Sequence, residues 1–218
     1  MTHPGCHATD ASPPRHAVSG VSDLADLLEA VARGTVSIDQ ALAQISPPAF
    51  DPVVVNRQVV ARLDTQREER HGFPEVIFAQ GKQFAHLERS IAQALTHGRD
   101  LLITRVAPKR GERLAKTFAD QGIMHHPEAR CLYRRLAASD DGEGQVVVFS
   151  AGTSDIPIAE EAALTARMLG ARVTTWYDAG VAGLHRLLAA ESLLKSGRVY
   201  IVVAGMEGAL PSVVGGLV

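Results

Sequence analysis

One pattern constrains the fold of this chain more than any other. From Gln145 onward, a short apolar strand, a glycine-containing loop and an amphipathic helix follow one another three times. The predicted strands are VVVF, VTTWY and VYIVV, and each unit occupies roughly 25 to 28 residues. Continuous apolar runs of this length are typical of parallel strands buried on both faces. The repeat therefore predicts a doubly wound α/β sheet over residues 141–218, with right-handed crossovers.

The three helices of this sheet are expected to begin directly after the loops. Pro157 and Pro211 suit the first turn of a helix, where a missing N–H leaves no hydrogen bond unmade. Apolar spacing predicts one buried stripe on the first helix, formed by Ile158, Ala162, Thr165 and Leu169. It predicts one further helix, ending at Gly197, whose apolar positions are Leu184, Leu187, Leu188 and Leu194.

The loops after the three strands read AGTSD, DAGVAG and AGMEGALP. Loops that follow parallel strands meet at one edge of the sheet, where open α/β sheets bind ligands. Glycines let a backbone approach a ligand closely, and the helix N-termini after Asp155 and at Pro211 favour phosphate or carboxylate. Tight turns alone explain the glycines of any single loop equally well, but three such loops on one edge favour a binding site.

Few ionisable residues occupy these loops. They are Asp155, Asp178 and Glu207, with His185 and Arg186 just beyond the second loop. Either Ser154 or Asp155 is also suited to capping a helix. Glu207 is a candidate for proton exchange, because a carboxylate among small apolar residues can have its pKa raised. An ordinary exposed glutamate is the alternative.

The chain before residue 141 divides into a predicted disordered tail, residues 1–19, and a smaller α/β N-terminal region, residues 20–140. Two short helices are expected near Leu24 and after Ser37. Strands are expected at VIFA and LLITRV, and helices from Phe84 and from Gly111. The pair His125-His126 is expected in a loop and CLYRRL in a helix. Gly81-Lys82 lacks the upstream glycine and the Ser or Thr of a phosphate-binding loop.

Composition excludes several classes of function. Lys and Arg number 22 against 24 Asp and Glu, so the net charge of -2 favours neither nucleic acid nor an anionic membrane as a partner. The two cysteines lack CxxC spacing, and no apolar run approaches the roughly 20 residues of a membrane span. A cytoplasmic protein with a small-molecule substrate is expected.

The segments AGTSDIPIAEEAALTA, YDAGVAGLHRLL and IVVAGMEGALPSVVGGLV closely resemble LarB, the carboxylase and hydrolase that begins synthesis of the nickel-pincer nucleotide cofactor. REERHGFPEVIFAQGK and LLITRV also look like LarB, so the resemblance extends from about residue 22. It implies a catalytic domain similar to PurE, the aminoimidazole ribonucleotide carboxylase, with a flavodoxin- or Rossmann-like three-layer sheet. The SD pair of PurE is Ser154-Asp155 here. Its His-Leu-Pro reads Ala209-Leu210-Pro211, which disfavours the purine reaction.

The resemblance implies a substrate and a set of site residues. The substrate would be nicotinic acid adenine dinucleotide, carboxylated by CO2 at C5 of the pyridinium ring and hydrolysed to AMP and pyridinium-3,5-biscarboxylic acid mononucleotide. Asp155 and Glu207 are the expected catalytic residues. The expected substrate-binding residues are Gly152, Thr153, Ser154, Asp178, Gly180, Gly183, His185, Arg186, Gly205, Met206, Gly208 and Pro211. The family's nucleophilic cysteine belongs to a segment beyond GGLV, and its role is not transferred to Cys131.

The same resemblance implies a homo-octamer with CO2 as co-substrate. It assigns no resident cofactor or metal site, and a requirement for Mg2+ stays open because no cluster with metal-ligand spacing is present. The helix that begins at Pro211 has eight residues before Val218, so an incomplete domain is expected, completed by further chain or by another subunit. Two alternatives remain: a non-catalytic nucleotide-binding module and a purine-type carboxylase.

Overall fold

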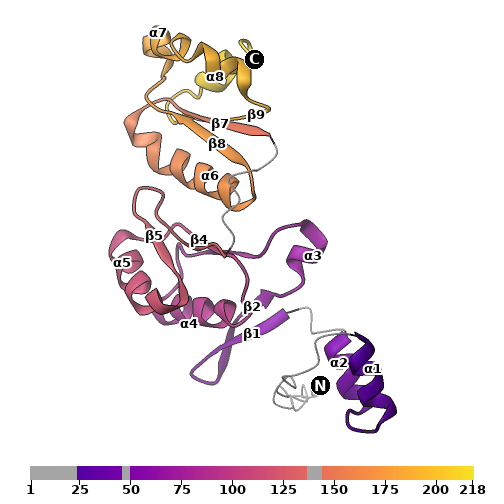
Figure 1. Cartoon of the computed structure of the whole chain (residues 1–218). Coiled ribbons are helices and arrows are strands. Elements are labelled where there is room, and N and C mark those ends of the chain that lie inside the picture. The colour runs from indigo at the N-terminus through magenta and orange to yellow at the C-terminus, as the bar shows by residue number, and fades with distance from the viewer. Residues whose placement is uncertain (1–23, 46–49, 137–143) are drawn as a thin grey trace, which may run out of the picture. The chain divides into compact units, whose positions relative to one another are not determined.

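The computed structural model describes residues 24–45, 50–136 and 144–218 (Figure 1). The chain divides into two compact units between Pro48 and Ala49. The described part of the first unit is a pair of helices, α1 (Leu24–Ala32) and α2 (Ile38–Ile45), as predicted. Leu27 and Ala30 of α1, Ala41 of α2 and Val36 of the turn between them form a small core. The predicted tail, residues 1–19, lies outside the described residues.

The second unit begins with a β-hairpin. Its strands are β1 (Phe50–Val55) and β2 (Gln58–Asp64), which pair antiparallel. Asn56 and Arg57 connect them, with φ of 50° and 64°. Positive φ at both central residues is the requirement of a type I′ turn, which favours glycine at the second. No hairpin was expected from the sequence, because Arg57 stands where that glycine would reveal the turn.

The next sheet has four strands in the order β3-β4-β6-β5. They are β3 (Val76–Phe78), β4 (Leu101–Thr104), β5 (Met124–His126) and β6 (Cys131–Arg134). Its helices are α3 (Arg67–His71), α4 (Phe84–Leu95) and α5 (Pro108–Thr117). Strands β3 and β4 run parallel, while β6 is antiparallel to both β4 and β5.

Two sequence predictions in this sheet were wrong. His125 and His126 lie in strand β5 and not in a loop, and CLYR forms strand β6 and not a helix. Cys131 and Leu132 are fully buried, and the Arg134 side chain donates from Nε to the carbonyl of Arg99 over 3.1 Å. Burial and pairing with two neighbouring strands therefore override the local helical pattern.

The last sheet is the predicted parallel one. It contains β7 (Gln145–Ser150), β8 (Arg172–Trp176) and β9 (Val199–Val203), in the order β8-β7-β9. The central strand is buried on both faces, since Val147, Val148 and Phe149 have no exposed surface. The doubly wound α/β fold expected from the apolar runs is confirmed. The predicted domain boundary at residue 140 lies outside the described residues.

Helices cover both faces of this sheet. On one face α6 (Ile156–Met168) packs through Ala159 and Ala163 against Val148. On the other face lie α7 (Leu184–Leu188), α8 (Glu191–Ser196) and α9 (Leu210–Gly215). They pack through Leu187, Leu194 and Leu210 against Val147 and Phe149. Figure 1 shows α6 and the pair α7 and α8 on opposite sides of the strands, which gives three layers.

The predicted stripe on α6 was wrong. Ile158 and Leu169 are exposed, whereas Ala159, Glu160, Ala163, Leu164 and Ala166 are buried. The physical reason is that α6 packs against two surfaces: Ala159 and Ala163 face the parallel sheet, and Leu164 joins Leu102 and Cys131 of the four-stranded sheet. A helix covered on two sides does not show a single apolar stripe.

The prediction of one continuous helix up to Gly197 was wrong. It is broken at residues 189–190 into α7 and α8. Leu187 and Leu194 are buried as expected, but Leu184 and Leu188 are about half exposed. Two short helices turn different faces toward the sheet, so the four leucines do not form one stripe.

Candidate functional site

The loops after β7, β8 and β9 meet at the carboxyl edge of the parallel sheet. The N–H of Ala151 donates to the carbonyl of Val203 over 2.9 Å, and that of Ala179 donates to the carbonyl of Ser150 over 2.9 Å. The strand order is β8-β7-β9, so β8 lies on one side of β7 and β9 lies on the other. The loops after β7 and β9 therefore border a topological switch point. Open α/β sheets bind ligands at this position.

Asp155 lies between the loops that border the switch point. Its Oδ2 accepts a hydrogen bond of 2.9 Å from the N–H of Gly152, at the start of a 3-10 turn that leads into α6. Its Oδ1 lies 3.3 Å from the position that a Cβ on Gly205 would take. A glycine at 205 therefore lets the carboxylate approach the backbone of the loop after β9.

The loop after β8 is held by an ion pair and by close backbone contact. The guanidinium of Arg186 pairs with Asp178, and Trp176 Nε1 donates to the carbonyl of Arg186 over 3.1 Å. A Cβ on Gly180 would lie 2.8 Å from the carbonyl oxygen of Ala151, and one on Gly183 would lie 2.7 Å from Nε of Arg186. Both glycines thus have a packing role, whether or not they also contact a ligand.

The loop after β9 has an unusual backbone. Glu207 has φ of 38° and Gly208 has φ of 61°. A left-handed conformation is rare for a residue with a side chain, and such outliers concentrate at functional sites. Met206 is 86% exposed, and Glu207 is exposed and not enclosed by the small apolar residues of its loop. The role of Glu207 as a proton carrier stays a proposal.

The other predicted binding residues lie on the surface of these loops and of the helices that follow them. Thr153 and Ser154 are exposed on the 3-10 turn, and His185 is exposed on α7. Pro211 is exposed in the first turn of α9. Their backbone positions place them at the carboxyl edge of the sheet, where a ligand has access to them.

Sequence reasoning missed a partly buried polar network beside this edge. The hydroxyl of Tyr177 donates to the carboxylate of Glu160, and Nε2 of His126 lies 3.3 Å from Oε2 of the same glutamate. The N–H of Ala129 donates to Nδ1 of His126 over 3.2 Å, so Nε2 holds the ring proton. Burial, and then Glu160, raise the pKa of Tyr177 to about 12. These residues are far apart in sequence and form no local motif.

Cys131 is poorly suited to nucleophilic chemistry. It is fully buried in β6, and its thiol donates to the carbonyl of Ala129 over 3.2 Å. Burial, followed by the charge of Glu161, raises its pKa to about 12. The thiol therefore stays protonated near neutral pH, whereas the thiolate is the nucleophilic form.

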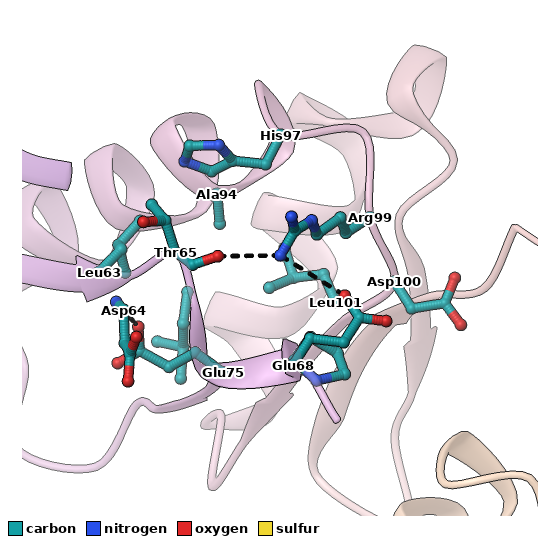
Figure 2. Close-up of a pocket in the computed structure, with 12 residues that line it drawn as sticks. Leu63, Asp64, Thr65, Glu68, Glu75, Ala94, His97, Arg99, Asp100 and Leu101 are labelled. Carbon is teal, nitrogen blue, oxygen red and sulfur yellow. Dashed lines mark hydrogen bonds and ion pairs between the residues drawn. The ribbon is translucent and has the colours of Figure 1, made fainter. Parts of the chain in front are cut away.

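A pocket of about 460 Å3, its open mouth included, lies away from the predicted site (Figure 2). Its lining residues belong to β2, α4, β4 and the segments between them, and none is a predicted site residue. Figure 2 shows Arg99 directed to the carbonyl of Thr65, at 2.9 Å, and to Glu68, at 3.6 Å. Asp64 and Asp100 also accept hydrogen bonds from the protein. The charged rim is therefore largely satisfied internally.

Two comparisons place the chain among known proteins. Residues 55–136 match the family described as LarB/PurE-like N-terminal domain. The uncharacterized protein MJ0165 of Methanocaldococcus jannaschii is 33% identical over 202 residues, which cover 90% of this chain and 77% of that protein. The chain belongs to the LarB family. Membership in the LarB family indicates a carboxylase-type enzyme with a nucleotide-related substrate.

The described residues contain neither a membrane-spanning helix nor a cluster of metal ligands. Among the helices that the structure describes, none combines the length and apolar character needed to cross a membrane. Within the same residues, no three His, Cys, Asp or Glu side chains gather as metal ligands.

Proposed function

We propose that this chain carboxylates nicotinic acid adenine dinucleotide at C5 of the pyridinium ring and hydrolyses its phosphoanhydride. The products are AMP and pyridinium-3,5-biscarboxylic acid mononucleotide, and CO2 is the co-substrate. The proposal is supported by one observation above all: in a LarB-family chain, the Asp155 carboxylate lies between two glycine-containing loops at the switch point of a parallel sheet. This is the position at which such sheets bind nucleotides.

The reaction must overcome an electron-poor ring. A pyridinium carbon does not attack CO2, but addition of a thiolate to the ring forms a C–S bond and gives an enamine whose C5 is nucleophilic. C5 then forms a C–C bond with CO2 and loses its proton. The C–S bond breaks, its electron pair returns to sulfur, and the ring is aromatic again. Attack of water on the phosphoanhydride releases AMP.

The residues can be assigned to parts of this sequence. The buried thiol of Cys131, with a pKa of about 12, is a poor source of the thiolate, and the resemblance assigns that group to a segment beyond GGLV. Asp155 is the candidate to accept the proton from C5, since it is partly buried at the centre of the loops. Glu207 is exposed in the loop after β9 and is the candidate to take a proton from the water that attacks the phosphoanhydride. Gly152 and Gly205 allow the nucleotide to approach the backbone.

Mass spectrometry separates this function from its alternatives. The purified natural protein is incubated with nicotinic acid adenine dinucleotide and 13C-bicarbonate, and in parallel with aminoimidazole ribonucleotide. The proposal predicts AMP together with a labelled dicarboxylated mononucleotide from the first substrate and no product from the second. A binding module would retain the dinucleotide without releasing AMP, and a purine-type enzyme would carboxylate only the second substrate.

The same assay tests the role of Glu207. Glu207→Gln keeps the size of the side chain but cannot exchange a proton, so it is expected to lower the rate of AMP release by roughly a hundredfold while dinucleotide affinity stays nearly constant. Glu191→Gln is the matched control, because Glu191 is also exposed and lies on α8, paired with Lys195. Equal rates for the two variants would remove Glu207 from the mechanism.

A further inference from the structure

Positive charge is concentrated in one short segment of the chain. The whole sequence has a net charge of -2, yet residues 105–116 contain five Lys or Arg residues and one Glu. This segment leaves β4 and forms α5. Because the whole chain carries a net negative charge, the position of this basic segment in the fold is informative.

The topology brings further cations to the same edge of the four-stranded sheet. Strands β3 and β4 are parallel, and the N–H of Ala79 donates to the carbonyl of Thr104 over 2.9 Å. Lys82, after β3, and Arg105, after β4, therefore leave the sheet at one edge. Strand β6 is antiparallel to β4, so its first residues lie there too, and the N–H of Val106 donates to the carbonyl of Arg130 over 2.7 Å.

The first turn of α5 lies at this edge as well. The guanidinium of Arg110 donates to the carbonyl of Lys82 over 2.8 Å. We call this group the basic edge; its members are Lys82, Arg105, Lys109, Arg110 and Arg130. They come from the loops after β3 and β4, the start of α5 and the residue before β6, so the fold and not the local sequence assembles them.

Among the described residues, most of these charges have no counter-charge. Arg105 pairs with Glu161 of α6, at 2.6 Å. In the part of the chain that the structure describes, no carboxylate forms an ion pair with Lys82, Lys109 or Arg130. Arg105 and Arg130 also have left-handed backbones, with φ of 56° and 51°. The left-handed backbone of these two arginines is energetically unfavourable, and neighbouring cationic side chains repel one another. Binding of an anion would relieve this repulsion.

We propose that the basic edge binds the phosphoryl groups of a nucleotide; resting on the proposed function, these belong to the adenylate half of the dinucleotide. Lys and Arg side chains are the usual partners of phosphate oxygens in proteins. Glu161, the partner of Arg105, follows Asp155 by six residues on α6, which corresponds to about 9 Å along the helix. An extended dinucleotide is long enough to contact both Asp155 and the basic edge.

Calorimetric titration of the full chain with inorganic pyrophosphate and with AMP tests the site. The double variant Lys82→Gln/Arg110→Gln is expected to bind both at least about tenfold more weakly, since two charge-assisted contacts are lost. Arg172→Gln/Arg198→Gln is the matched control, because it removes the same number of positive charges. Both arginines are exposed at the amino edge of the parallel sheet, away from the basic edge. Equal affinities in the two double variants would overturn the proposal, provided that thermal unfolding shows both to be folded.

Further outcomes separate this site from the proposed function. If the natural protein carboxylates the dinucleotide, Lys82→Gln/Arg110→Gln should raise KM for the dinucleotide far more than it lowers kcat, and should change the affinity for nicotinic acid mononucleotide little. Unchanged KM would overturn the basic edge and leave the function intact. AMP binding that is lost in this variant, in a protein that carboxylates nothing, would support the basic edge and contradict the function. If the protein bound a single-stranded oligonucleotide but did not bind AMP, the proposal for the basic edge would be overturned.

Discussion

At the scale of single residues, the candidate site depends on which side chains are absent as much as on which are present. Gly180 and Gly205 leave room for the carbonyl of Ala151 and for the carboxylate of Asp155, so three loops can lie against one another. The sequence interpretation treated these glycines as ligand contacts or as residues of tight turns. Their packing role depends on distances between loops that are 25 or more residues apart, and no local pattern contains that information.

Gly180→Ala tests this packing role. The added Cβ would lie 2.8 Å from the carbonyl oxygen of Ala151, so the backbone must shift, and we expect a loss of about 1–3 kcal/mol in the free energy of unfolding. Gly215→Ala is the control, because no atom lies within 4 Å of its Cβ position in α9. Urea denaturation of both variants checks the prediction, which fails if Gly180→Ala is as stable as the control.

Cys131 gives a second test at the residue scale. Its buried thiol, with a pKa of about 12, should stay unmodified by iodoacetamide at pH 8 in the native protein and react once urea unfolds the chain. Peptide mapping of the Cys131 peptide provides the measurement. Rapid labelling of the native protein would contradict both the burial and the exclusion of this cysteine as a nucleophile.

At the scale of elements, α6 joins the two sheets of the second unit. It packs through Ala163 against the parallel sheet and through Leu164 against Leu102 of the other sheet. Glu160 on this helix also accepts from Tyr177 and lies next to His126. The position of α6 in sequence was predicted because Pro157 and Gly170 delimit it. Its two-sided burial was not, because that requires knowing which strands pack on each side.

The Tyr177–Glu160 contact makes a prediction about stability and pH. Because the pKa of Tyr177 is raised in the folded state to about 12, its contribution to stability is complete below about pH 10 and is lost as the pH rises toward 12. Tyr177→Phe removes this titration and leaves Glu160 without the phenol. The unfolding free energies of wild type and variant should therefore differ at pH 8 and converge between pH 10 and 12. A constant difference over this range would contradict the account.

At the scale of the whole molecule, the sequence predicts the parallel sheet better than the rest. VVVF, VTTWY and VYIVV are strands because each is a continuous apolar run at regular spacing, and their order then places the three loops at one edge. The four-stranded sheet was predicted in part, since His125 and Cys131 lie in antiparallel strands whose pairing depends on distant residues. The family resemblance and the topology of the parallel sheet both support the proposal that the site lies at the carboxyl edge of this sheet.

The 13C-bicarbonate assay on wild type and Asp155→Asn tests whether Asp155 is a catalytic residue. Asn keeps an oxygen that accepts from the N–H of Gly152 but has no carboxylate to take up a proton. We expect wild type to release AMP and labelled dicarboxylated mononucleotide. Asp155→Asn should bind the dinucleotide but form labelled product at least about a hundredfold more slowly. Wild-type rates in Asp155→Asn would contradict the assignment of this edge of the sheet as the catalytic site.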